Sequence, residues 1–242
     1  MADRKVDFLV IGSGIAGLSF ALKASKFGKV LIVTKSNEDE SNTKYAQGGV
    51  AAVVDKSDSF EKHIIDTQIA GDGLCDVEIV ENVVREAPER IAELISYGTS
   101  FDKEESGLYD LAKEGGHSAH RILHYKDITG YEIERALLAQ AHSDPNIEIV
   151  THYFAIDLIT QHHLGEYVDK NREDITCYGI YAFNTSSHLV DQILSKVTVM
   201  ASGGAGHVYS STTNPTIATG DGIAMVYRAK GKVRNMEFMQ FH

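Results

Sequence analysis

One short segment gathers most of the side chains that could do acid–base or charge-recognition chemistry. It reads Glu114-Gly115-Gly116-His117-Ser118-Ala119-His120-Arg121-Ile122-Leu123-His124 and holds one carboxylate, three imidazoles and one guanidinium. On spacing alone the three histidines could be metal ligands, but no second ligand cluster accompanies them, which disfavours a metal site. The remaining interpretation of the segment is a charged network that binds a substrate, and the alternative is a plain polar loop.

A second candidate site lies near the N-terminus. The sequence Gly12-Ser13-Gly14-Ile15-Ala16-Gly17 follows the apolar run Phe8–Ile11 and opens an amphipathic helical pattern. Gly12 permits a tight turn, Gly14 lets backbone approach a pyrophosphate, and Gly17 lets helix and strand pack closely. The N-terminus of the helix offers N–H groups and a positive dipole end to phosphates. The pattern predicts a dinucleotide site, with a structural glycine turn as the alternative.

The acidic residue that usually binds the ribose is missing from the end of the next predicted strand. Val30–Val33 is followed by Thr34-Lys35-Ser36, where a dinucleotide fold commonly carries Asp or Glu. Lys35 could contact a 2′-phosphate, which would favour NADP, or the adenosine side of a flavin dinucleotide. It could also be a solvated lysine, and the residues themselves leave these readings open.

The elements that must position these groups follow an α/β pattern. Short apolar runs typical of buried parallel strands alternate with helical patterns, and the period changes to that of antiparallel strands at about 147–195. We predict a Rossmann-like domain with a central parallel sheet and a smaller antiparallel β-meander. Strands are expected at 8–11, 30–33, 147–150, 153–159, 177–183, 189–193 and 197–200, and helices from 15 to an end at Gly28 and at 63–70, 76–96, 131–142 and 222–229.

Composition bounds the class of protein. The chain has 242 residues, 43% hydrophobic and 24% charged, so it can bury a sizeable core. Its net charge of −11 disfavours nucleic acid and anionic membranes as partners, and an anionic substrate needs a local cationic pocket.

The stretch Phe8–Leu22 could pass for a secretory signal, but glycines interrupt it. Because Cys75 and Cys177 match no metal spacing, we expect reduced thiols in a cytoplasmic protein without a membrane span.

The polar loop after the second predicted strand carries the most specific pattern. It contains Ser41-Asn42-Thr43-Lys44-Tyr45-Ala46-Gln47-Gly48-Gly49-Val50-Ala51-Ala52. Adjacent glycines let backbone lie flat on a ring system, and Ser, Thr and Gln can hydrogen-bond its polar edge. The segment resembles the flavin loop of the succinate dehydrogenase and fumarate reductase flavoprotein family. Within it, Tyr45-Ala46-Gln47-Gly48-Gly49 resembles the version found in L-aspartate oxidases.

This resemblance implies FAD as the cofactor. Many family members carry a histidine in the loop that bonds covalently to the flavin, whereas the matching residue here is Asn42, which implies non-covalent FAD. L-aspartate oxidases tolerate lysine at the position of Lys35, so the resemblance argues against NADP. It implies cofactor contacts by residues 12–17, by Lys35 and by residues 42–49.

The segment around Glu114 also resembles the same stretch of L-aspartate oxidases. Succinate and fumarate enzymes usually carry an uncharged amide at this position. A carboxylate can accept hydrogen bonds from the α-amino group that distinguishes aspartate from succinate, and it disfavours substrates that leave it unpaired. We therefore expect Glu114 to discriminate the substrate, with His117, His120 and Arg121 in the surrounding network.

Three further motifs lie toward the C-terminus. Ala201-Ser202-Gly203-Gly204 resembles a flavin contact of the family, where small residues let backbone pass close to the cofactor. Thr219-Gly220-Asp221-Gly222 resembles a motif whose Asp touches FAD, although Asp221 could also be a helix N-cap. The last residues, 235–242, resemble a motif whose histidine binds a substrate carboxylate, which makes His242 a candidate substrate-binding residue.

The resemblance covers essentially the whole chain. It implies an FAD-binding domain over residues 1–236 and the start of a capping domain at 237–242. We expect the sequence to be a fragment that is truncated before the capping domain. Because the family's catalytic arginine lies in the part that would follow, we expect this chain to be inactive by itself.

The implied reaction is the oxidation of L-aspartate to iminoaspartate, with hydride passing from Cα to flavin N5 and oxygen or fumarate as the electron acceptor. It is the first step of quinolinate and NAD biosynthesis, so L-aspartate or fumarate is the expected ligand and quinolinate synthase a partner. A flavoprotein subunit of fumarate reductase or succinate dehydrogenase is the alternative, against which Asn42 and Glu114 argue. A non-catalytic nucleotide-binding module is the third reading.

Overall fold

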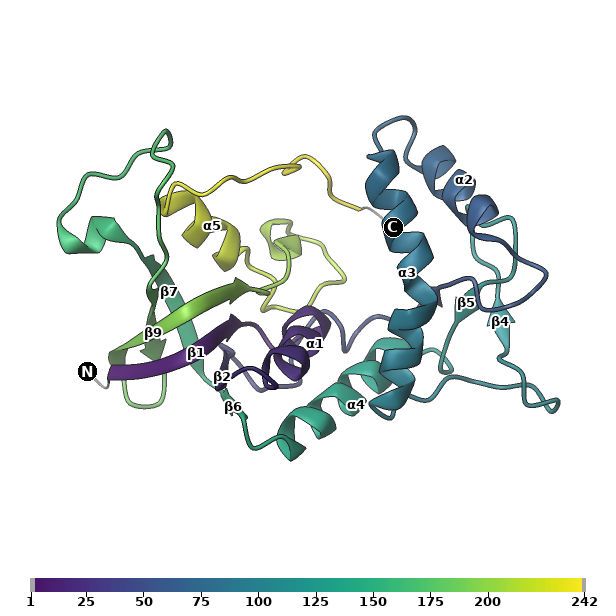
Figure 1. The fold of residues 1–242 in the computed structure, drawn as a ribbon, viewed down its shortest axis with the longest axis horizontal. Helices are drawn as coiled ribbons and strands as arrows, with labels where there is room; N and C mark the ends of the chain where they lie inside the picture. The colour runs from purple at the N-terminus through teal and green to yellow at the C-terminus, as the bar shows by residue number, and fades with distance from the viewer. Residues whose placement is uncertain (1–2, 241–242) are drawn as a thin grey trace. The chain divides into compact units, whose positions relative to one another are not determined.

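The computed structural model describes residues 3–240, which form two compact units (Figure 1). Unit 1 is formed by two stretches of the chain, Met1–Thr43 and Leu138–His242. Unit 2 is the intervening stretch, Lys44–Leu137. Each unit has its own sheet and its own buried cluster, and each is described by itself.

Unit 1 is built on a six-stranded sheet with the order β6-β2-β1-β9-β8-β7. Its elements are β1 (Asp3–Ile11), α1 (Ile15–Ala24), β2 (Val30–Val33), β6 (Ile147–Val150), β7 (Tyr153–Ile159), a 3-10 helix (Gln161–Leu164), β8 (Gly179–Asn184), β9 (Leu189–Met200), a second 3-10 helix (Gly206–Val208) and α5 (Asp221–Arg228). Strands β6, β2, β1 and β9 pair in parallel, while β7, β8 and β9 pair antiparallel. The predicted parallel sheet and antiparallel meander are thus both present, as parts of one continuous sheet.

Strand β9 joins the two parts of this sheet. It is a single strand of 12 residues, where the sequence pattern predicted two strands with a break after residue 193. Its first half pairs antiparallel with β8, and from Gln192 to Met200 it pairs in parallel with β1. The antiparallel part begins at β7 and not at residue 147, because β6 pairs in parallel with β2.

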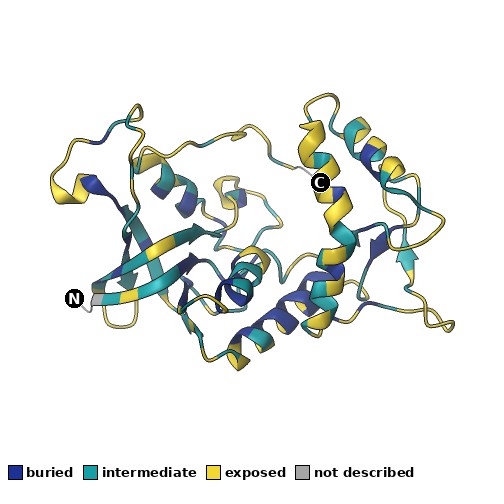
Figure 2. Ribbon diagram, viewed as in Figure 1, coloured by how far each residue is buried: buried dark blue, intermediate teal, exposed yellow. Residues whose placement is uncertain are grey.

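Alternation along β1 divides the core of unit 1 between the two faces of the sheet. Leu9 and Ile11 pack in one cluster with Met225 of α5. Val10 points to the opposite face, where its Cγ1 lies 3.1 Å from the position of a Cβ on Gly17 of α1. Helices α1 and α5 therefore cover opposite faces, and buried residues gather on β2 and the carboxyl half of β1 (Figure 2).

Helix α1 ends earlier than the sequence predicted. It was expected to reach Gly28, but its last residue is Ala24 and its C-cap is Ser25. Gly28 serves a close approach instead, because a Cβ there would lie 2.5 Å from Asp7 Oδ2. The same oxygen accepts the N–H of Lys29 at 2.8 Å, which ties the turn before β2 to β1.

Unit 2 combines a helical hairpin with a small sheet. Its elements are β3 (Val50–Ala51), α2 (Phe60–Ala70), α3 (Val77–Ser96), β4 (Leu111–Ala112) and β5 (Ile122–Leu123), and α4 (Thr129–Ser143) leads the chain back to unit 1. Side-chain oxygens of Ser59 and Asp76 cap α2 and α3. The strands pair antiparallel in the order β3-β5-β4, and Leu123 of β5 packs in a buried cluster with Ile91 of α3. Within residues 3–240, no helix is long and apolar enough to cross a membrane.

Candidate functional site

A cavity of about 540 Å³ opens at the carboxyl edge of the sheet in unit 1. Its lining includes Ile11, Val33 and Met200, which are the last residues of β1, β2 and β9. The carboxyl ends of these three strands lie in register, because Ile11 pairs with both Val33 and Met200. Since the chain leaves β1 for β2 on one side and reaches β9 on the other, the cavity lies at a topological switch point, where open α/β sheets bind ligands.

Most of the predicted cofactor-binding residues line this cavity, although they come from five separate segments. They are Gly12, Ser13, Gly14, Ile15, Ala16, Lys35, Asn42, Thr43, Ala201, Ser202, Gly203 and Asp221. Gly17 does not line it, and acts in packing instead, because a Cβ there would lie 2.0 Å from Gly12 O.

The turn after β1 can only be made by glycine. Gly12 has a φ of +111°, and a Cβ on it would lie 2.2 Å from Ala201 O. Backbone hydrogen bonds hold both neighbours, from Gly12 N to Val33 O and from Ala201 N to Ile11 O, each at 2.9 Å. Helix α1 then starts beside the cavity, and its N-cap, Gly14, provides no side-chain cap. The positive end of the helix dipole therefore faces the cavity.

Two polar atoms in the lining need a partner. Among the described residues, Ser13 Oγ and Asn42 Oδ1 are buried and have no hydrogen-bond partner. Asn42 also lies close to the loop after β9, since its Nδ2 is 3.6 Å from the position of a Cβ on Gly203. Buried polar atoms are nearly always paired, so these two indicate a polar ligand. The glycine turn, the helix N-terminus and the unpartnered oxygens together fit a dinucleotide.

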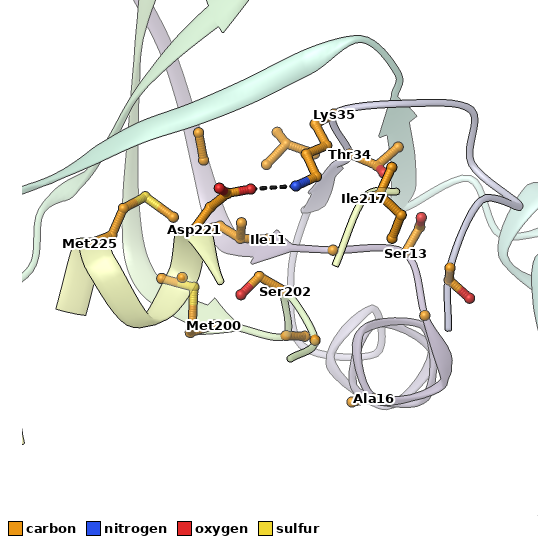
Figure 3. Close-up of a pocket in the computed structure, with 18 of the residues that line it drawn as sticks. Ile11, Ser13, Ala16, Thr34, Lys35, Met200, Ser202, Ile217, Asp221 and Met225 are labelled. Carbon is orange, nitrogen blue, oxygen red and sulfur yellow. Dashed lines mark hydrogen bonds and ion pairs between the residues drawn. The ribbon is translucent and has the colours of Figure 1, made fainter. Parts of the chain in front are cut away.

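Lys35 and Asp221 form an ion pair across one side of the cavity (Figure 3). Lys35 Nζ also donates to Thr219 Oγ1 at 2.6 Å and lies 5.9 Å from the ring centre of Phe154. The lysine is therefore not a solvated side chain, because it connects the end of β2 to the start of α5. The N-cap reading of Asp221 is wrong: Gly220 is the N-cap of α5, with a φ of +74°, and Asp221 is the first helical residue.

One wall of the cavity was not predicted from the sequence. Tyr153 and Phe154 of β7 and Met225 of α5 line it, as does a second cation, Lys232. The signal that could have found the aromatic pair is the pairing of β6. Had β6 been predicted as a parallel strand beside β2, the residues after it would have been expected at the same carboxyl edge.

In unit 2, the rest of the predicted flavin loop lies beside Glu114. The predicted cofactor residues Lys44, Tyr45, Ala46, Gln47, Gly48 and Gly49 belong to this unit. A Cβ on Gly48 would lie 3.5 Å from Glu114 Oε1, and a Cβ on Gly49 would lie 2.4 Å from Leu123 O. Glycines therefore let this strip of backbone lie against β5, with the Glu114 carboxylate as its neighbour.

Glu114 itself is exposed and begins a tight turn. The N–H of His117 donates to Glu114 O at 3.2 Å, and Gly116 has a φ of +83°. The other predicted substrate-binding residue, His242, lies outside the described residues.

Arg121 is fully buried and is the centre of an ion-pair network. Its Nε and Nη2 donate to the two carboxylate oxygens of Asp58 at 2.7 and 2.8 Å, and its Nη1 donates to Asp66 Oδ2 at 2.6 Å. Nη1 also lies 3.1 Å from His117 Nδ1, which must accept because a guanidinium only donates. His117 and Arg121 thus belong to one network, whose carboxylates were not identified from the sequence; its role in substrate binding stays a prediction.

The three histidines of this segment have separate partners. His117 contacts Arg121, while His120 Nδ1 lies 3.0 Å from a backbone oxygen of β4. His124 Nδ1 lies 3.4 Å from Asp102. The imidazoles therefore serve three different local contacts.

The Asp66 carboxylate gives unit 2 a specific acid sensitivity. Burial acts to raise the pKa of Asp66, but the Ser118 N–H and the Arg121 guanidinium outweigh it and lower this pKa from 3.8 to about 2. Because the folded pKa lies below the unfolded one, the ionised carboxylate stabilises the fold by about 2 kcal/mol above about pH 5, and this contribution is lost between about pH 4 and 2. We expect Asp66→Asn to lower the free energy of unfolding at pH 6 and the difference to shrink below about pH 4. Urea unfolding followed by circular dichroism measures it, and a difference independent of pH would contradict the assignment.

Comparison with known proteins identifies the family. Residues 7–242 match a protein-family model described as an FAD binding domain. An L-aspartate oxidase (2-b, chloroplastic) of Nicotiana tabacum is 54% identical over 239 residues, which cover 99% of this chain and 36% of the tobacco protein. The L-aspartate oxidase of Vibrio cholerae is 46% identical over 248 residues, covering 100% of this chain and 45% of that protein.

The comparison with solved structures indicates the same flavoprotein family. A quinol fumarate reductase of E. coli is 30% identical, with a TM-score of 0.85, and the match covers 94% of this chain and 37% of that one. This chain therefore spans less than half the length of each of these relatives. The family match includes every residue that lines the cavity. The chain belongs to the FAD-binding domain family of the succinate dehydrogenase and fumarate reductase flavoproteins, and over nearly its whole length it is similar to L-aspartate oxidases.

Proposed function

We propose that the protein containing this sequence oxidises L-aspartate to iminoaspartate, with non-covalently bound FAD and with oxygen or fumarate as the electron acceptor. The observation that carries the proposal is the Glu114 carboxylate beside Gly48, in the loop that resembles a flavin loop. Similarity to L-aspartate oxidases from a plant and a bacterium supports it.

The residues around the cavity of unit 1 would hold the cofactor. The backbone of Ser13, Gly14 and Ala16 at the start of α1 would offer N–H groups to the pyrophosphate, since the N–H of Gly12 donates to Val33 O and that of Ile15 donates to Thr43 Oγ1. Ser13 Oγ and Asn42 Oδ1 each have an open hydrogen-bonding position, and the Lys35–Asp221 pair offers both charges to polar groups of the adenosine half. The amide of Asn42 cannot make the covalent bond that a histidine makes, so the cofactor is held by these contacts alone. Bound FAD supplies the hydride acceptor.

Glu114 would select the substrate. Its carboxylate can accept charge-assisted hydrogen bonds from the α-ammonium group of aspartate. Succinate and fumarate lack that group, so binding either of them would leave the carboxylate unpaired beside a dianion. His242 is proposed to bind one substrate carboxylate, which helps to orient Cα for hydride transfer.

The product of this reaction is an imine that leads to quinolinate. The proposal therefore assigns the protein to the first step of quinolinate and NAD biosynthesis. Quinolinate synthase, which would consume the unstable imine, is the proposed partner enzyme.

A fumarate reductase or succinate dehydrogenase flavoprotein is the second candidate. The similarity to the E. coli quinol fumarate reductase favours it. Asn42, in place of a covalently bonding histidine, and Glu114, in place of a neutral amide, argue against it. Both differences fit an amine-bearing substrate and a cofactor that is not covalently bound.

The test is direct. The purified protein that contains this sequence is expected to produce hydrogen peroxide in air when L-aspartate is added, and L-aspartate is expected to bleach its flavin absorbance without oxygen. Acid precipitation is expected to release all of the flavin into the supernatant. Bleaching by succinate but not by L-aspartate would contradict the oxidase assignment, and flavin that stays in the pellet would contradict non-covalent binding.

A further inference from the structure

We propose that Asp66, held by the buried Arg121, positions the Glu114 turn through Ser118 and thereby sets the preference for an ammonium-bearing substrate. In this scheme Asp66 is a positioning residue that touches no substrate. The proposal rests on the proposed function, in which Glu114 recognises the α-ammonium group.

The loop that carries Glu114 needs an external anchor. It runs from the end of β4 at Ala112 to the start of β5 and contains Gly115 and Gly116. Among the described residues nothing lies within 4 Å of the position of a Cβ on either glycine, so a side chain at either position would face open space. Every residue of such a segment has an entropic cost of ordering, and that cost must be offset by contacts elsewhere.

Two tethers hold the residues that follow the Glu114 turn. Ser118 donates both its N–H and its hydroxyl to Asp66 Oδ2, each at 2.8 Å. One position earlier, His117 Nδ1 accepts from Arg121 Nη1 at 3.1 Å. Asp66 lies on α2, so the Ser118 tether fastens the tip of the loop to a helix, whereas the His117 tether joins the tip to Arg121, just before β5.

The base of this anchor is rigid, because it is buried and doubly bonded. The side chain of Arg121 is 0% exposed and that of its partner Asp58 is 1% exposed, and two hydrogen bonds join them. The backbone oxygen of Arg121 also accepts the N–H of Ala52 at 3.0 Å, just after Gly49. Arg121 is therefore bonded both to the residue that follows β3 and, through Asp66, to the residue that follows the Glu114 turn.

This arrangement predicts an effect on selectivity more than on the chemical step. Only an ammonium-bearing substrate uses Glu114, so a loosened Glu114 weakens aspartate binding and leaves succinate nearly unaffected. The Glu114 carboxylate must then become ordered each time aspartate binds, and this loss of entropy weakens the binding of aspartate.

The test uses Ser118→Ala and Asp66→Asn in the protein that contains this sequence, with Ser106→Ala as the matched control on another loop of unit 2. Ser118 is exposed, so its substitution leaves the buried Asp58–Arg121 pair intact even if Asp66→Asn impairs folding. We expect both variants to lower the ratio of kcat/KM for aspartate over succinate by about three- to tenfold, the factor that corresponds to the net loss of one ordinary hydrogen bond, mostly through KM. Amide hydrogen exchange at residues 113–120 should be faster in both variants and unchanged in Ser106→Ala.

A double-variant cycle with Glu114→Gln identifies the route of the effect. If Asp66 and Ser118 act through Glu114, their substitution produces no further loss of selectivity in the Glu114→Gln background. Wild-type exchange at 113–120 in Ser118→Ala, or an equal loss of selectivity with and without Glu114, overturns the positioning role. If the unsubstituted protein does not oxidise aspartate, the proposed function fails, and this is seen before any variant is compared.

Discussion

Gly12→Ala is expected to abolish the retention of FAD. Two independent penalties arise at this residue. A φ of +111° is strained for alanine, which costs about 1–3 kcal/mol, and the new Cβ would lie 2.2 Å from Ala201 O. The second penalty cannot be relieved by a side-chain rotation, because the obstructing atom belongs to the backbone. The loop after β9 would have to move, and Ala201 and Ser202 of that loop line the same cavity.

The expected magnitude is a dissociation constant for FAD at least about 100-fold higher, since about 3 kcal/mol of combined strain and displacement corresponds to that factor. Flavin absorbance after gel filtration and titration of the apoprotein with FAD measure it. Gly107→Ala is the matched control, because Gly107 of unit 2 also has a positive φ, +86°, but among the described residues has nothing within 4 Å of the position of its Cβ and does not line the cavity. Thermal unfolding of both apoproteins separates a loss of binding from a loss of folding. Wild-type affinity in Gly12→Ala would remove the turn from the cofactor site.

Glu114→Gln is expected to shift the substrate preference from aspartate toward succinate by roughly 100-fold. A hydrogen bond between charged groups contributes about 1.5–3 kcal/mol, and the amide retains only a neutral acceptor. The amide also removes the repulsion between the Glu114 carboxylate and a dianionic substrate. Binding of aspartate should therefore weaken while that of succinate or fumarate strengthens, and the ratio of the two kcat/KM values reports both changes.

Two further variants make the result specific. Glu105→Gln changes the net charge by the same amount on an exposed residue of the same unit, so it should leave the ratio unchanged. Glu114→Asp keeps the charge but shortens the side chain, and an intermediate ratio is expected. Equal ratios in Glu114→Gln and in the unsubstituted protein would remove Glu114 from substrate recognition.

Features of the fold that depend on neighbouring residues could be predicted from the sequence, whereas features that depend on distant residues could not. The turn at Gly12 and the start of α1 depend on neighbouring residues, so spacing alone predicted a dinucleotide site where the cavity is found. The proximity of Gly48 and Glu114 is not local, and only the resemblance to a family suggested that the two act together. The end of α1 shows the opposite case. Gly28 looks like a helix stop in the sequence, but glycine is needed there because a Cβ would clash with Asp7 of β1.

The remaining parts of the site depend on long-range pairing that a single sequence does not reveal. Arg121 was a candidate for the substrate network, yet its charge is matched by Asp58 and Asp66, which are 63 and 55 residues away in the chain. No pattern distinguishes these two carboxylates from the many others in an acidic sequence. Likewise, the residues around Lys35 left three readings open and only the resemblance to a family argued against NADP, whereas its partner Asp221 became evident from the fold.

The position of β9 has a consequence for the order in which the protein can fold during synthesis. Strand β1 is made first, but one of its two neighbours, β9, is made about 190 residues later, which takes about 10–40 s at typical translation rates of about 5–20 residues per second. During that interval the backbone of β1 has an unpaired edge, which is a template for association with other chains. The nascent chain therefore has a long aggregation-prone window, and it closes only when β9 emerges and inserts between β1 and β8.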